Sequence, residues 1–150
     1  MTAASPRAAL AVASDHAGLE EKNRIAARLA EAGVACDDLG VHAPESVDYP
    51  CVARKMAEAI LAGTYARGIL VCGTGLGMSM AANRFRGIRA ALCYNTDVAR
   101  LARDHNDANI LVLPGREPTE DPVDEIVDTW LETPFCGEER HLRRLALMDK

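Results

Sequence analysis

The stretch Arg67-Gly-Ile-Leu-Val-Cys72-Gly-Thr-Gly-Leu-Gly-Met-Ser-Met-Ala-Ala-Asn83 decides the fold, because it combines a strand, a loop and a helix pattern in succession. Its apolar run 69–71 predicts a buried strand that ends on a cysteine. Three glycines then occupy every second position: Gly73, Gly75 and Gly77. In an open parallel sheet, ligands bind at the carboxyl end of such a strand. The free amides of the loop and of the following helix turn predict an anion site there.

Strand and helix patterns alternate along the rest of the chain. Strands are expected at 8–14, 34–38, 69–72, 88–93 and 110–113. Helices are expected at 19–32, 50–61, 78–82, 97–104 (capped by Thr96), 122–131 and 137–148. The alternation predicts an α/β fold, a single-domain three-layer αβα sandwich around a five-stranded parallel Rossmann-like sheet, with a C-terminal helix. Right-handed crossovers and a switch point favour the strand order 2-1-3-4-5.

The length, composition and net charge of the chain limit the classes of protein to which it can belong. A chain of 150 residues with 49% hydrophobic residues predicts one domain over 1–150, with residues 1–7 as a flexible tail. The net charge of −5 argues against a nucleic-acid surface, and the sequence has neither a signal peptide core nor an apolar run of membrane length. We therefore expect a cytoplasmic protein.

The five cysteines are scattered and form no C-x-x-C pair, which indicates neither a zinc site nor a dithiol redox motif. Reduced thiols are expected in the cytoplasm. Cys72 stands out because it ends a strand beside the glycines. The other four are expected only to pack, as most free cysteines do: Cys36, Cys51, Cys93 and Cys136.

The predicted topology brings two polar loops together. Asp15 and His16 follow the first strand, and Cys72 ends the third, so the strands that flank the switch point present both loops to one crevice. Asp15 can equally act as a helix cap, and the sequence leaves both interpretations open.

Three phosphate-binding motifs do not fit this loop. The glycines follow the third predicted strand with the spacing G-x-G-x-G, which is not the dinucleotide fingerprint, and no lysine completes a P-loop. A thiol phosphatase needs an arginine six residues after its cysteine, where this chain has Met78. The thiol is therefore better suited to take a proton from carbon than to attack phosphorus.

Aldose–ketose isomerisation of a sugar phosphate fits these groups. It needs a base, which Cys72 can supply as thiolate, and donors for an enediolate oxygen, which the amides of 73–77 can supply. Thr74 can shuttle a proton or orient the thiol, and His16 and His105 are both candidates to open the sugar ring. The expected phosphate ligands are three arginines, of which the last two share a helix face through their i,i+4 spacing: Arg116, Arg140 and Arg144.

Five motifs in order resemble ribose-5-phosphate isomerase type B, a family that also contains the galactose-6-phosphate isomerase subunits. They are Ser14-Asp-His-Ala-Gly18, Asp48-Tyr-Pro50, Cys72-Gly-Thr-Gly-Leu-Gly-Met-Ser-Met-Ala-Ala-Asn83, Arg103-Asp-His-Asn-Asp107 and Arg140-His-Leu-Arg-Arg144. The resemblance implies an enzyme without metal or cofactor that interconverts ribose 5-phosphate and ribulose 5-phosphate in the non-oxidative pentose phosphate pathway. It also implies a homodimer, sometimes a tetramer, with active sites at the subunit interface.

The resemblance also implies roles for individual residues. Cys72 matches the catalytic base, Thr74 its helper and His105 the ring-opening group, while the three glycines, with Asn83 supporting the loop region, match the enediolate-binding turn. The other matches are sugar contacts, with Asn106 given by the partner subunit, and phosphate ligands: Asp15, His16, Tyr49 and Asn106, then Arg116, Arg140 and Arg144 with His141 close by. Having Cys72 and Met78, the chain resembles the branch that uses cysteine. An isomerase of allose, galactose or tetrose phosphate, or a non-catalytic sugar-phosphate or nucleotide-binding module, are the alternatives.

Overall fold

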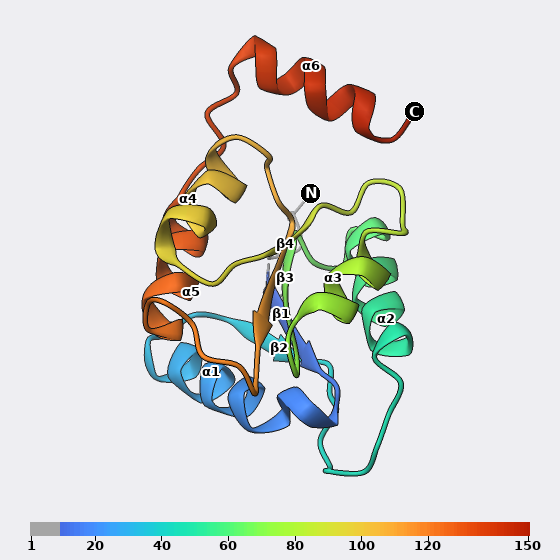
Figure 1. Cartoon of the computed structure of the whole chain (residues 1–150), viewed down its shortest axis with the longest axis vertical. Helices are drawn as coiled ribbons and strands as arrows, with labels where there is room; N and C mark the ends of the chain where they lie inside the picture. Colours follow the sequence, from blue (N-terminus) through green and yellow to red (C-terminus); the bar gives the residue numbers. More distant parts are fainter. Residues whose placement is uncertain (1–9) are drawn as a thin grey trace, which may run out of the picture.

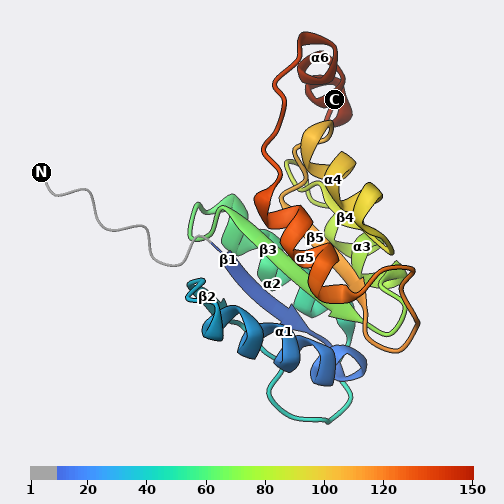
Figure 2. The same cartoon turned by 90° about the vertical axis from the view of Figure 1, so that its left-hand side faces the viewer.

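The computed structural model describes residues 10–150, which form a parallel sheet between two helical layers (Figures 1 and 2). The five strands are β1 Leu10–Ser14, β2 Cys36–Asp38, β3 Arg67–Cys72, β4 Ala90–Leu92 and β5 Ile110–Pro114. Every neighbouring pair is parallel, so the predicted fold class is confirmed. The expected tail at 1–7 and the first two residues of the expected first strand lie outside the described residues.

The helices cover both faces of the sheet, as expected. They are the 3₁₀ turn η1 His16–Gly18, and α1 Leu19–Glu31, α2 Tyr49–Leu61, α3 Leu76–Ala82, α4 Thr96–Asp104, α5 Val123–Glu132 and α6 Glu139–Met148. Apolar side chains of α1, α4 and α5 form one core with the sheet, and those of α2 and α3 form the other. The C-terminal α6 leaves this sandwich and lies beyond the end of α4 (Figures 1 and 2). No helix between residues 10 and 150 is long and apolar enough to cross a bilayer.

The predicted order of the last two strands was wrong, because the sheet runs β2-β1-β3-β5-β4. All five residues of β5 are buried, as suits a central strand, whereas β4 has only three, all partly exposed. The connection from β3 to β4 crosses the position that β5 occupies, and the connection from β4 to β5 runs back toward β3. A right-handed crossover in the reverse direction places its helix on the opposite face, and α4 accordingly packs beside α5.

The start of α4 also differs from the prediction. Asn95, not Thr96, caps the helix, and its side chain accepts a hydrogen bond from the Val98 N–H at 2.8 Å. Thr96 instead donates its N–H and hydroxyl to Asp121, which ties the beginning of α4 to the loop after β5.

Candidate active site

Cys72 is the last residue of β3 and lies opposite Pro114 of β5. Its side chain is buried, and its sulfur accepts a hydrogen bond from the Gly75 N–H at 3.2 Å. Gly75 has φ +84°, a conformation that other residues rarely adopt, and a Cβ there would lie 2.4 Å from a methyl carbon of Leu92. Only glycine therefore lets the chain fold back so that a backbone amide meets the thiol.

Thr74 shapes the same turn. Its hydroxyl accepts a hydrogen bond from the Leu76 N–H at 3.1 Å, at the first residue of α3, and its carbonyl accepts one from the Tyr94 hydroxyl. In the described part of the chain its side chain makes no hydrogen bond to the thiol. The structure thus places Thr74 beside the predicted base, with its side chain engaged in starting α3.

Tyr49, the first residue of α2, lies against the glycine loop. A Cβ added to Gly77 would fall 2.6 Å from the Tyr49 ring, so the absence of a side chain at Gly77 makes room for the tyrosine. At Gly73 an added Cβ would meet only the Ala17 methyl, at 3.7 Å, an ordinary contact. Tyr49 remains 40% exposed, which leaves its ring accessible to a ligand.

The loop after β1 comes next to β3, as predicted. Asp15 is buried, its N–H donates to the Val71 carbonyl at 3.2 Å, and its carboxylate accepts from the Gly18 N–H at 3.0 Å. Asp15 is therefore the cap of η1, which was one of its two possible roles. His16 is half-buried, and its Nδ1 accepts from the Val47 N–H at 3.2 Å. In the neutral ring this leaves the proton on Nε2, which can donate to a ligand.

The loop after β5 also lies at the carboxyl ends of the strands. The Gly115 N–H donates to the Cys72 carbonyl at 2.7 Å, and the Arg116 N–H donates to the Gly73 carbonyl at 3.0 Å. The Arg116 side chain is exposed. We call this group at the carboxyl ends of the strands the cysteine end: Asp15, His16, Tyr49, Cys72–Gly77, Tyr94 and Arg116.

Tyr94 belongs to this group, although it was not predicted from the sequence. Burial, and then the nearby Glu117 and Cys72, raise the pKa of its phenol, which favours the protonated hydroxyl that donates to the Thr74 carbonyl. Tyr94 follows a strand by two residues, and a polar residue at that position was the available signal. Tyr94 was missed because β4 is short and because the place of β4 beyond β5 in the sheet was not predicted.

The remaining predicted residues lie at the opposite end of the sheet, where the strands begin. His105 caps the end of α4, and Asn106 follows it. The loop containing them reaches the start of β3, where the Gly68 N–H donates to the Asn109 carbonyl at 2.9 Å. Cys72 is at the far end of that strand, whose six residues extend about 17 Å. One chain therefore does not bring His105 and Cys72 to the same ligand.

Three residues of α6 join His105 at this end of the sheet, and we call the whole group the histidine end: His105, Asn106, Arg140, His141 and Arg144. The His105 and His141 rings stack with their centroids 4.3 Å apart. His141 is buried and its Nε2 has no hydrogen-bond partner among residues 10–150. Burial, and then the neighbouring His105 and Arg140, lower the pKa of His141, which favours the neutral ring. Arg140 and Arg144 are exposed.

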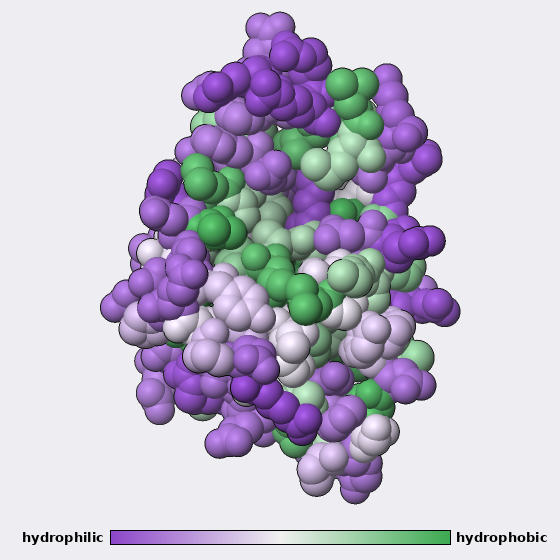
Figure 3. All heavy atoms as spheres, viewed as in Figure 1, coloured by the Kyte–Doolittle hydropathy of each residue, from purple (hydrophilic) through white to green (hydrophobic). Residues whose placement is uncertain are grey.

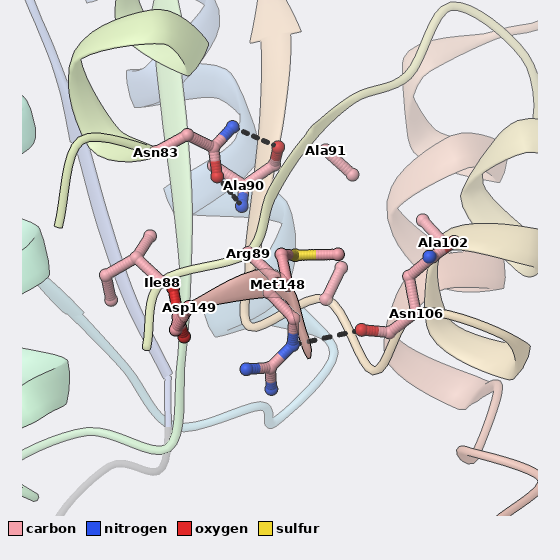
Figure 4. A pocket seen from close by; sticks show the side chains of 10 residues that line it. Asn83, Ile88, Arg89, Ala90, Ala91, Ala102, Asn106, Met148 and Asp149 are labelled. Carbon is pink, nitrogen blue, oxygen red and sulfur yellow. Dashed lines mark hydrogen bonds between the residues drawn. The ribbon is translucent and has the colours of Figure 1, made fainter. Parts of the chain in front are cut away.

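Asn83 does not support the glycine loop directly. It lies past the other end of α3, and its amide accepts from the Ala90 N–H and donates to the Ala90 carbonyl, both at 2.8 Å, which fixes α3 to β4. It lines a pocket of about 360 Å³ that Asn106 and the end of α6 also line (Figure 4). Arg89 crosses the pocket and donates to the Asn106 carbonyl at 3.0 Å.

No group of three or more His, Cys, Asp or Glu side chains suited to a metal occurs within the described residues. The fold instead positions a buried thiol, bonded by a backbone amide, at the cysteine end. It positions imidazole and guanidinium groups at the histidine end. These are groups for moving protons and for binding an oxyanion.

Comparisons with known proteins identify the family of the chain. The Ribose/Galactose Isomerase family model matches residues 10–148. Ribose-5-phosphate isomerase B of Escherichia coli (strain K12) is 42% identical over 136 residues, 91% of each chain. A ribose 5-phosphate isomerase from Thermotoga maritima is 54% identical, with a TM-score of 0.89 over 93% of this chain and 96% of that one. The Clostridium thermocellum ribose-5-phosphate isomerase B is 48% identical, also with a TM-score of 0.89, over 93% and 94%. The chain therefore belongs to the Ribose/Galactose Isomerase family.

Proposed function

We propose that this protein is an aldose–ketose isomerase that interconverts D-ribose 5-phosphate and D-ribulose 5-phosphate through a cis-enediolate. The observation that carries the proposal is the Cys72 thiol, which is buried at a strand end and bonded by the Gly75 amide. A base for a C–H proton needs such a site, shielded from bulk water and beside fixed amide donors. The names of the relatives supply the substrate.

The proton transfer needs few groups. With the aldose open, the Cys72 thiolate takes the proton from C2, and the electron pair of that bond forms the C1–C2 double bond as O1 becomes negative. Amides of the glycine loop stabilise this oxygen. Return of the proton to C1, with proton exchange between O1 and O2, gives the ketose. Thr74, beside the thiol, assists the exchange, and no oxidant, metal or cofactor takes part.

Ring opening and phosphate binding need the histidine end. An imidazole takes the proton from the O1 hydroxyl while a proton is delivered to the ring oxygen, and we assign this step to His105. Asp15, His16, Tyr49 and Asn106 contact the sugar hydroxyls. The guanidinium groups bind the phosphate through charge-assisted hydrogen bonds, with His141 beside them: Arg116, Arg140 and Arg144.

A kinetic panel tests the reaction. The purified protein is given ribose, allose, galactose and erythrose phosphates, with Cys72→Ala as control, and ketose formation is measured. We expect ribose 5-phosphate to give the highest kcat/KM. A higher value for a hexose or tetrose phosphate moves the proposal to that sugar. Tight binding of one of these phosphates without turnover identifies a sugar-phosphate-binding module instead.

We further propose that the active enzyme is a homodimer, or a tetramer built from such dimers, in which the histidine end of one subunit completes the cysteine end of the other. Figure 3 shows apolar side chains gathered between α4, α3 and α6, on the face that holds the edge strand β4. The large exposed apolar residues of these helices are Leu76, Met80, Val98, Leu101, Leu142, Leu147 and Met148. An apolar patch around an open sheet edge is typical of a surface that a second subunit covers.

Two-fold symmetry explains how this arrangement works. In a symmetric dimer each subunit gives the same surface to its partner, so one His105 reaching the partner's cysteine end implies a second, equivalent site. Two complete sites then form from two chains, neither of which holds a complete site alone. The unpaired thiols are consistent with the reducing cytoplasm as the location.

Mixing two inactive variants tests the shared site. Cys72→Ala and His105→Ala subunits are unfolded together and refolded in equal amounts. Random pairing makes half of the dimers mixed, each with one intact site, so about a quarter of the wild-type activity should return. Each variant refolded alone is the control. No recovery, with mixed dimers present by native mass spectrometry, would show that both groups act within one chain.

A further inference from the structure

One peptide group of the glycine loop is held from both sides. The carbonyl of Thr74 accepts a hydrogen bond from the Tyr94 hydroxyl, and the N–H of the same peptide, that of Gly75, donates to the Cys72 sulfur. Because C=O and N–H point in opposite directions in a trans peptide, the phenol and the thiol lie at the two ends of one dipole. The hydrogen-bond chain runs from the phenol through the peptide to the sulfur.

This peptide needs to be held, because one of its flanking residues is glycine. Glycine populates positive and negative φ with similar ease, so the Thr74–Gly75 peptide is free to rotate unless something fixes it. A rotated peptide would turn its carbonyl oxygen toward the sulfur and oppose a negative charge there. The Tyr94 hydroxyl bonds the carbonyl in the orientation that keeps the N–H on the sulfur.

Tyr94 is itself fixed by the loop after β5. Its carbonyl accepts from the Glu120 N–H at 2.8 Å. The neighbouring Asn95 donates to the Glu120 carboxylate at 2.9 Å, and Thr96 donates to Asp121. The phenol therefore has a rigid base from which to hold the glycine loop.

We propose that Tyr94 is a positioning residue for the reaction, which orients and polarises the Thr74–Gly75 peptide so that its N–H stabilises the Cys72 thiolate. The inference rests on the proposed function, because it gives that thiolate the role of base. A hydrogen bond to an ionised acceptor is about twice as strong as a neutral one, and bonds in a chain strengthen each other. The effect therefore grows when the sulfur carries charge.

Several other charged or titratable groups surround the thiol and must be kept constant in a test. Asp15 and His16 lie on the loop after β1, Tyr49 lies at the start of α2, and Arg116 and Glu117 lie on the loop after β5. Replacing Tyr94 by Phe changes none of these and keeps the ring, so only the hydroxyl is removed.

The experiment measures the alkylation of Cys72 by iodoacetamide against pH, with the Cys72 peptide followed by mass spectrometry. In Tyr94→Phe the midpoint of the curve should rise by about 0.5–1 pH unit, and kcat/KM below the midpoint should fall about 3- to 10-fold. Tyr65→Phe is the matched control, because it removes a buried tyrosine hydroxyl that donates to Asp37, away from the thiol. Circular dichroism verifies that both variants fold.

The outcomes separate this inference from the proposed function. Alkylation requires no turnover, so a shifted midpoint in a protein without isomerase activity would support the hydrogen-bond chain and overturn the isomerase. An active isomerase whose Tyr94→Phe variant keeps the wild-type midpoint would overturn the chain alone. An equal shift in Tyr65→Phe would also overturn it, since the effect would then be general to the fold.

Discussion

The cysteine end and the histidine end differ in how this chain bonds their polar groups. At the cysteine end, the backbone of three loops is bonded together, and Cys72 accepts a hydrogen bond. At the histidine end, Arg140 and Arg144 are exposed, with Arg140 donating to the Glu138 carboxylate at 2.9 Å, and a buried nitrogen of His141 has no partner in the part of the chain that the structure describes. Buried polar atoms in native proteins are nearly always bonded. The loops of the cysteine end are therefore fixed by their own chain, although the buried Ser14 hydroxyl beside them also has no partner among residues 10–150. The exposed guanidinium groups and the His141 nitrogen of the histidine end are in contrast available to a ligand or a second subunit.

The largest expected effect tests the cysteine end. Replacing Cys72 by Ala removes the proposed base, and kcat should fall about 10²–10⁴-fold while the fold is retained. Steady-state kinetics measures the loss, and Cys51→Ala, at an exposed cysteine outside the site, is the control. Near-normal turnover of Cys72→Ala would remove the distinction between the two ends, because the chemistry would then lie elsewhere.

A smaller effect is expected at the histidine end. Arg144→Ala should raise KM about 10- to 100-fold with little change in kcat, because charge-assisted hydrogen bonds to the phosphate are lost. Arg143→Ala is the matched control, since adjacent helix residues point about 100° apart. If kcat fell and KM stayed the same, the assignment of this end to phosphate binding would be wrong.

The reactivity of the other thiols gives a further test of how the cysteine end differs from the rest of the molecule. Burial raises the pKa of Cys93 to about 12, and burial with the nearby Asp38 and Asp37 raises the pKa of Cys36 to about 12. At pH 8 only about 1 in 10⁴ of such thiols is ionised, so Cys72 should react with iodoacetamide at least about 100-fold faster than either. Peptide mass spectrometry gives the rates. Equal rates at Cys72, Cys93 and Cys36 would mean that the glycine loop gives Cys72 no advantage.

The smallest expected effect is the pH dependence of stability at the histidine end. The pKa of His141 is lower in the folded chain than its ordinary value near 6.5, so the unfolded chain binds this proton more readily. The stabilisation is therefore present above about pH 6.5 and is lost as pH falls from there through the lower, folded value. The Tm should decrease over this range, and less so in His141→Ala. The same decrease in that variant would assign the effect to other groups.

Much of the cysteine end could be predicted from the sequence, because its determinants are local. A buried run that ends in Cys72, followed by glycines, specifies a strand and a turn whatever lies around them. The convergence of Asp15 and Cys72 needed only the switch-point rule, and it is confirmed by the bond from the Asp15 N–H to the Val71 carbonyl.

The errors concern features that tertiary packing determines. The exchange of β4 and β5 depends on how completely each strand is buried by its neighbours, and the contact of Tyr94 with the glycine loop depends on that exchange. Packing was expected for four cysteines: Cys93 is buried and the partly buried Cys36 packs against one core, whereas Cys51 and Cys136 are exposed. The distance between His105 and Cys72 likewise follows from the direction of α4.

The position of α6 has a consequence for how the activity should scale with the amount of protein. Outside the sandwich, this helix is attached to its own chain by the stack of His141 on His105 near its start and by the Gly87 N–H bonded to Asp149 after its end. If its arginines serve a neighbouring subunit, the catalytic unit exists only while two chains stay together. Mass action then makes turnover per chain fall on dilution below the dissociation constant of the dimer, and makes substrate, which bridges both chains, oppose that fall.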